Sequence, residues 1–124
     1  MHISNFEKVG DFMEAFGQDV LYEPTIPGFN LSALRLDLIT EEVQELQDAL
    51  ANKNMLEIAD ALTDILYVVY GAGHAFGIDL DDCFNEVHRS NMTKLGPDGR
   101  PIYREDGKVL KGENYEPPNL GQFL

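Results

Sequence analysis

Apolar residues recur at the three- to four-residue spacing of an α-helix along most of the first ninety residues. The first predicted helix runs from Ser4 to about Gly17, and Glu7 three positions after Ser4 gives it a capping box. A loop containing two prolines follows at residues 22–30. Three more helices are predicted from cap and breaker residues, over residues 31–52, 54–77 and 80–93. Gly71 and Gly73 are expected to loosen the helix that contains them. We therefore expect an all-α antiparallel bundle of about four main helices.

The pattern changes after residue 94. Turn signals at residues 97–99 and 106–107 flank short β-prone runs, which predict a small hairpin pairing residues 102–104 with 109–110. The final stretch, residues 116–124, contains two adjacent prolines and is predicted to be extended. The expected organisation is a helical core, residues 1–94, with a hairpin-like C-terminal extension of the same domain, residues 95–124.

Composition narrows the function classes. The chain has 124 residues, enough for one domain, with 22 acidic and 9 basic side chains and a formal charge of −13. Such acidity argues against a nucleic acid polymer or an anionic membrane as partner. No apolar run is long enough to span a bilayer, and the N-terminus lacks an apolar signal segment. A single cysteine, Cys83, rules out an intramolecular disulfide and fits a reducing compartment. We therefore expect a cytoplasmic protein.

The charge is also unevenly distributed. Residues 1–88 contain 17 acids and three cations, whereas residues 89–124 contain five acids and six cations. A short basic tail can arise by chance, but it can also supply positive groups for an anionic ligand.

Carboxylates of the second and third predicted helices lie where the two helices can meet. At 100° per residue, an apolar stripe centred on Ile39 is expected to face the core, and it comprises Leu36, Val43, Leu46 and Leu50. Glu42 and Glu45 border this stripe, while Glu57 and Asp60 share one face of the next helix. The short link between these helices predicts antiparallel packing. Four converging carboxylates would repel one another without a counter-charge. Oxygen-only ligands favour Mg²⁺, or Mn²⁺, over zinc, although an exposed glutamate-rich helix face remains the alternative.

The same residues carry a family resemblance. The segment Glu41-Glu42-Val43-Gln44-Glu45, followed by Glu57-Ile58-Ala59-Asp60 and Asp64-Ile65-Leu66-Tyr67, resembles the EExxE…ExxD signature of the all-α nucleotide pyrophosphatases. That superfamily includes MazG, the phosphoribosyl-ATP pyrophosphatases and the dimeric dUTPases and dCTPases. The resemblance covers roughly residues 31–94. It implies metal-dependent cleavage of a nucleoside triphosphate between the α- and β-phosphates, which yields a nucleoside monophosphate and pyrophosphate.

The resemblance also implies roles for individual residues. The metal ligands would be Glu42, Glu45, Glu57 and Asp60. Glu41 would orient or deprotonate the attacking water. The phosphate contacts would come from Arg89, Asn91, Lys94 and Lys108. The base pocket would be formed by Phe16, Gln18, Tyr22 and Asp64.

Simpler interpretations remain open for several of these residues. Basic side chains at the end of the fourth helix can merely complement its dipole, and Phe16 can belong to the core. His74 is expected to be a hydrogen-bonded helix residue, and Cys83 a packing residue.

The predicted function is that of a nucleoside triphosphate pyrophosphohydrolase that acts on a dNTP in nucleotide-pool sanitation. The apolar helix faces predict a homodimer or a dimer of dimers. One alternative is the phosphoribosyl-ATP hydrolysis of histidine synthesis. Another is a non-catalytic acidic interaction protein, in which Glu42→Gln and Asp60→Asn would lose nothing measurable.

Overall fold

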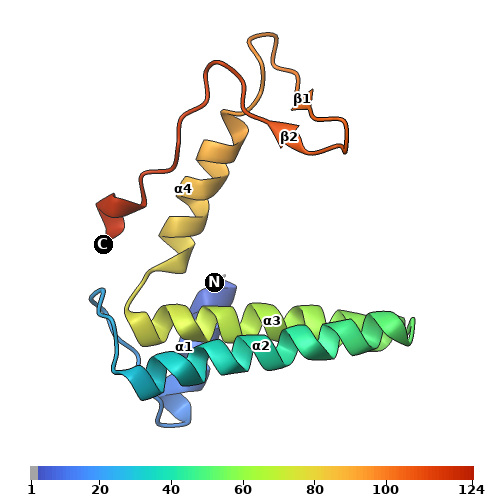
Figure 1. Ribbon diagram of the computed structural model, residues 1–124. Coiled ribbons are helices and arrows are strands. Elements are labelled where there is room, and N and C mark those ends of the chain that lie inside the picture. The colour runs from blue at the N-terminus through green and yellow to red at the C-terminus, as the bar shows by residue number, and fades with distance from the viewer. Residues whose placement is uncertain (1–2) are drawn as a thin grey trace. The chain divides into compact units, whose positions relative to one another are not determined.

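A computed structural model describes residues 3–124, and its regular structure is almost entirely helical (Figure 1). The elements in chain order are α1 (Asn5–Ala15), α2 (Phe29–Ala51), α3 (Met55–Phe76), α4 (Leu80–Met92), β1 (Ile102–Tyr103), β2 (Val109–Leu110) and a 3₁₀ helix η1 (Leu120–Phe123). The predicted all-α class with four main helices is confirmed. One compact unit extends to Leu80, and a second comprises Asp81–Leu124. The predicted division at residue 94 stays a prediction.

Helix ends follow the predicted caps. Ser4 and Glu7 form both bonds of the capping box before α1. The side chain of Asn54 accepts a hydrogen bond from the Glu57 N–H at 3.1 Å and opens α3. Gly77, with φ of 67°, closes α3 in the left-handed conformation. These local signals were sufficient to place three helix termini.

Two glycines that were expected to loosen the third helix lie inside a continuous α3. A Cβ added at Gly71 would lie 2.8 Å from Nη1 of Arg35, and one at Gly73 would lie 2.6 Å from Cδ1 of Leu80. Both positions therefore serve close packing rather than helix termination.

The first unit is built around the pair α2 and α3, which lie side by side and antiparallel, with α1 packed against α3 (Figure 1). Its buried apolar side chains are few and mostly small: Val9, Met13, Ala49, Ala61 and Ala75. A core of this size leaves much of the apolar surface of α2 and α3 exposed.

The buried face of α2 differs from the predicted stripe. Leu36 and Leu50 were expected to face the core, yet they are 64% and 54% exposed. The side that packs within the chain is rotated toward Arg35 and Ala49, which are buried. The single-chain pattern could not distinguish a face that packs internally from one that stays open.

In the second unit, the predicted hairpin is confirmed, with Ile102 paired to Leu110 and Tyr103 to Val109 in antiparallel register. The C-terminal stretch is not simply extended, because it includes η1 and is bonded to α4. Ser90 Oγ donates to the Glu116 carbonyl at 2.7 Å, and the Asn119 N–H donates to Glu86 Oε2 at 2.7 Å.

Within residues 3–124, no single helix has the length and apolar composition of a membrane span; α3 and α4 pass that test only when read together as one broken segment.

Candidate functional site

Three carboxylates meet at the seam between α2 and α3. One oxygen each from Glu42, Glu45 and Asp64 lies within 4.8 Å of the other two. Glu42 and Glu45 are three residues apart and so share a face of α2, while Asp64 comes from α3 opposite them. Glu42 and Asp64 are half-buried, and Glu45 is exposed. We refer to these three residues as the carboxylate cluster.

The cluster carries unneutralised negative charge. Burial, followed by the neighbouring Glu45 carboxylate, raises the pKa of Glu42, and Asp64 and Asp60 add to this effect. Burial, Asp60 and Glu45 likewise raise the pKa of Asp64. Glu42 Oε2 is buried and has no hydrogen-bond partner among residues 3–124. An oxygen in that state is suited to a cation, because a buried carboxylate without a partner is costly.

The donor set fits a hard divalent cation. All three side chains offer oxygen only, which suits Mg²⁺ or Mn²⁺, and no histidine or cysteine joins the cluster among the described residues.

The structure brings together some of the predicted ligands but not all of them. Glu42 and Glu45 lie in the cluster as expected. Asp60 is close enough to raise the pKa of both Glu42 and Asp64. Glu57 is exposed in the first turn of α3 and lies outside the cluster. Asp64, which was assigned to the base pocket, lies in the cluster, and its role in base binding stays a prediction.

Helix register explains this selection. Since α2 and α3 run antiparallel from a short link, residues progressively farther from the link face each other. Glu42 is therefore level with Asp64, whereas Glu57 lies nearer the link. The length of that link is visible in the sequence, so counting outward from it is the signal that would have placed Asp64. The functional roles of Glu57 and Asp60 stay predictions, as does that of Glu41, which is exposed beside Glu42.

The predicted phosphate-binding residues lie in the second unit. Arg89 donates two hydrogen bonds to the Glu86 carboxylate, at 2.7 and 2.9 Å, so its guanidinium is already engaged. Asn91 is exposed, Lys94 is half-buried at the end of α4, and Lys108 is exposed on the hairpin. Their contact with phosphate stays a prediction.

The predicted base-binding residues surround the end of α1. Phe16 is 70% exposed and packs on Phe12, with ring centroids 4.5 Å apart. Phe12 meets Tyr67 of α3 edge to face at 5.5 Å. Gln18 Oε1 accepts a hydrogen bond from Nη2 of Arg35 at 3.5 Å. These contacts place the Gln18 amide against Arg35 of α2 and join the aromatic rings of α1 to Tyr67 of α3.

Arg35 was missed by sequence reasoning, which only counted it as a cation. Its side chain is buried, at 8% exposure, and its Nε has no hydrogen-bond partner among the described residues. The available signal was its position, seven residues before Glu42 on α2, because that interval returns to the same helix face.

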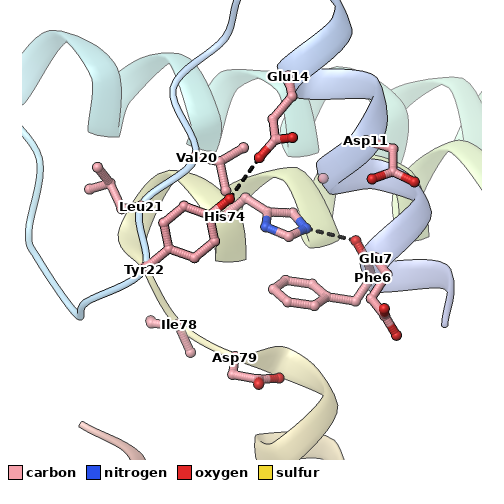
Figure 2. Close-up of a pocket in the computed structure, with 12 residues that line it drawn as sticks. Phe6, Glu7, Asp11, Glu14, Val20, Leu21, Tyr22, His74, Ile78 and Asp79 are labelled. Carbon is pink, nitrogen blue, oxygen red and sulfur yellow. Dashed lines mark hydrogen bonds between the residues drawn. The ribbon is translucent and has the colours of Figure 1, made fainter. Parts of the chain in front are cut away.

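A separate cavity of about 320 Å³ lies between α1, residues 20–22 and the end of α3 (Figure 2). Phe6 and His74 form its stacked wall, with ring centroids 3.8 Å apart, and Nε2 of His74 lies 2.7 Å from the Phe6 carbonyl. His74 is therefore hydrogen-bonded, as expected. Tyr22 lies at the cavity and donates its hydroxyl proton to Glu14 at 2.7 Å. Acidic side chains line the cavity: Glu7, Asp11, Glu14 and Asp79.

Comparison with known proteins identifies relatives of this chain. The family model for phosphoribosyl-ATP pyrophosphohydrolase matches residues 9–91. An uncharacterised protein of Acanthamoeba polyphaga mimivirus is 39% identical over 120 residues, which cover 91% of this chain and 45% of that protein. The chain thus spans less than half the length of this curated relative.

A solved structure also resembles the chain. It belongs to a protein from Exiguobacterium sp. 255-15 that is described as a candidate NTP pyrophosphohydrolase. The TM-score is 0.52 at 25% sequence identity, and the match covers 94% of this chain and 90% of that one.

Proposed function

Since this chain belongs to the phosphoribosyl-ATP pyrophosphohydrolase family, we propose that it is a metal-dependent nucleoside triphosphate diphosphatase. The substrate is a dNTP, cleaved between its α- and β-phosphates to a nucleoside monophosphate and pyrophosphate. The observation that carries this proposal is the carboxylate cluster, with its buried and unpartnered Glu42 oxygen.

The cluster supports a divalent cation, which we propose to be Mg²⁺, with Mn²⁺ as a substitute. Glu42, Glu45 and Asp64 would hold it, and the charge of Asp60 would strengthen the attraction. Glu57 lies outside the cluster, and it is proposed as a ligand only because of its position in the EExxE…ExxD signature. When bound, the cation would supply positive charge against the phosphates and lower the pKa of a water.

Side chains of the chain itself are proposed for proton transfer and for binding of the leaving pyrophosphate. Glu41 is exposed next to Glu42 and is our candidate for taking a proton from the attacking water. Asn91, Lys94 and Lys108 are candidates for holding the leaving pyrophosphate. Arg89 is a weaker candidate, because both of its bonded nitrogens are directed to Glu86.

The charge of −13 favours a small nucleotide over a nucleic acid polymer. A polymer presents many phosphates that must each be neutralised, whereas one triphosphate needs only the cation at the cluster and a few basic side chains.

The test is pyrophosphate release by the purified chain from a panel of dNTPs and NTPs with Mg²⁺, in the presence and absence of EDTA. We expect release from at least one dNTP that EDTA abolishes. Asp37→Asn removes an exposed carboxylate from α2 outside the cluster and serves as a control. Absence of release from every nucleotide, or release that EDTA does not affect, would overturn the proposal.

Phosphoribosyl-ATP is the second candidate substrate, favoured by the description of the matching family. It belongs in the same panel. A kcat/KM for phosphoribosyl-ATP well above that for every dNTP would assign the chain to that reaction instead.

A further inference from the structure

Arg35 is a buried cation that has no counter-charge within the described part of the chain. Its side chain is 8% exposed, and among residues 3–124 it forms no ion pair. Nη2 donates a long hydrogen bond of 3.5 Å to Gln18 Oε1, and Nε has no hydrogen-bond partner among the described residues. Burial lowers the pKa of this guanidinium, which shows that its surroundings disfavour the charge.

The fold nevertheless preserves room for this side chain. Gly71 of α3 lies directly against it, since a Cβ there would be 2.8 Å from Nη1 and 3.9 Å from Sδ of Met13. An apolar residue at position 35 would avoid the cost of burying a charge. A cation kept at this cost is better explained by a ligand that it binds than by folding.

The position of Arg35 relates it to the carboxylate cluster. Arg35 precedes Glu42 by seven residues on α2, and Gly71 follows Asp64 by seven residues on α3. Both pairs therefore share one antiparallel register. At about 1.5 Å per residue, the two levels are about 10 Å apart along the seam. That separation is about the length of a nucleoside monophosphate, from its phosphate to the far edge of its base.

Aromatic side chains of α1 and α3 lie between the level of the cluster and the level of Arg35 along α3. Tyr67 lies between Asp64 and Gly71 in the sequence of α3, and Phe12 meets its ring at 5.5 Å. Phe16 extends this surface and is largely exposed. Aromatic faces of this kind stack on nucleobases regardless of their identity, so they bind a base without selecting one.

We propose that Arg35, oriented by Gln18, binds the acceptor edge of the substrate's nucleobase and makes the chain select guanine over adenine. This inference rests on the proposed function and adds a specificity-determining residue to it. A guanidinium carries five donors and no acceptor in a planar fork. Guanine presents two acceptors, O6 and N7, on one edge, whereas adenine presents an amino donor in place of O6.

The test is equilibrium binding of non-hydrolysable dGTP and dATP analogues, and of inorganic triphosphate, with Mg²⁺. Arg35→Gln should weaken binding of the dGTP analogue by about 10- to 100-fold. Binding of the dATP analogue should change by less than about threefold, and binding of triphosphate should not change. Arg35→Lys should not restore the preference, because an ammonium lacks the fork.

Two further variants separate the position of the Arg35 guanidinium from the mere presence of a positive charge. Gly71→Ala keeps the arginine but introduces a Cβ into the space of Nη1, so part of the guanine preference should be lost. Lys8→Gln removes an exposed cation of α1 and should leave the preference intact. A structural arginine would lower the Tm when replaced, whereas we expect Arg35→Gln to keep or raise it.

The outcomes are distinguishable. An equal loss for all three ligands would make Arg35 a phosphate contact, and no loss would leave it without a binding role; either result overturns the inference. Analogue binding without pyrophosphate release from dGTP would overturn the proposed hydrolysis while the base preference can still be measured. If the unmodified chain binds neither analogue, both proposals fail.

Discussion

At the scale of single residues, the carboxylate of Glu42 is placed for binding at a cost to folding. Its pKa is raised by burial and by Glu45, so the folded chain disfavours its ionised form near neutral pH. The contribution of such a group to stability is fully present below its unfolded-state pKa and is lost as pH rises from there through its folded-state pKa. The divalent cation that we propose for this cluster would reverse the effect, because its charge would neutralise the carboxylates.

Glu42→Gln should therefore separate stability from activity. Without metal, we expect the variant to melt a few degrees above the unmodified chain, because one repelling charge is gone. With Mg²⁺, we expect it to lose at least about 100-fold in kcat/KM and most of the metal-dependent rise in Tm. Thermal melts with and without Mg²⁺, together with pyrophosphate release, measure both effects. Asp37→Asn controls for loss of one carboxylate, and full activity of Glu42→Gln would contradict the assignment.

Glu86 behaves in the opposite way. The guanidinium of Arg89, followed by the backbone N–H of Asn119, holds the pKa of Glu86 at about 2, below its usual value of 4.5. The stabilisation is therefore present above pH 4.5 and is lost as pH falls toward 2. These bonds fasten the C-terminal segment to α4.

The difference in unfolding free energy between the unmodified chain and Glu86→Gln should consequently shrink between pH 4.5 and 2. Urea unfolding at several pH values measures it. Glu105→Gln removes an exposed charge of the hairpin and serves as the control. A difference that stays constant down to pH 2 would show that Glu86 is not held ionised by its partners.

At the scale of elements, helix ends depend on single glycines for different reasons. Gly77 and Gly17 both have positive φ, at 67° and 73°. A Cβ at Gly77 would lie 2.0 Å from the Glu23 carbonyl oxygen, whereas one at Gly17 would meet nothing within 4 Å. A side chain would therefore be strained by the left-handed backbone at both positions, but only at Gly77 would it also clash with a neighbour.

Gly17→Ala should cost about 1 kcal/mol of unfolding free energy from backbone strain alone. Gly77→Ala should cost about 3 kcal/mol or more, because the loop at Glu23 must move as well. Chemical denaturation of the two variants checks the difference. Equal costs would mean that the loop yields without penalty.

The element scale also shows what local pattern can and cannot predict. Ser4, Asn54 and Gly77 act through bonds to residues within one turn, so their sequence spacing was enough to place helix ends. Gly71 and Gly73 suggested a break, because glycine is a poor helix former. Their neighbours, Arg35 and Leu80, come from elsewhere in the chain and could not be anticipated from spacing.

At the scale of the whole molecule, α2 and α3 leave large apolar side chains exposed to solvent in a single chain. Several large apolar side chains of α2 and α3 are at least one-third exposed. They are Leu36, Val43, Leu50, Leu62, Leu66 and Val69. Exposed apolar surface of this extent on paired helices is typical of an association interface. We propose a homodimer or a dimer of dimers that buries these side chains.

Light scattering should therefore give two or four times the mass of one chain. Leu62→Glu, which places a charge on this surface, should shift the protein toward the monomer and lower its Tm. Leu124→Glu introduces the same charge at another exposed leucine, on the C-terminal residue, and should leave the mass unchanged. A monomeric mass for the unmodified chain would contradict the proposal.

The sequence by itself determined the all-α class, three of the helix ends, the hairpin and the position of Glu42 and Glu45 on one side of α2. Each of these depends on periodicity or on contacts a few residues apart, which are visible in one dimension. The tertiary structure decided that Asp64 rather than Glu57 completes the cluster, a pairing that the link length permits but does not fix, and that Arg35 is buried against Gly71. Both outcomes depend on the register and rotation of α2 against α3. Those two quantities are set by packing across the seam, where small residues such as Ala49, Ala61 and Gly71 permit close approach.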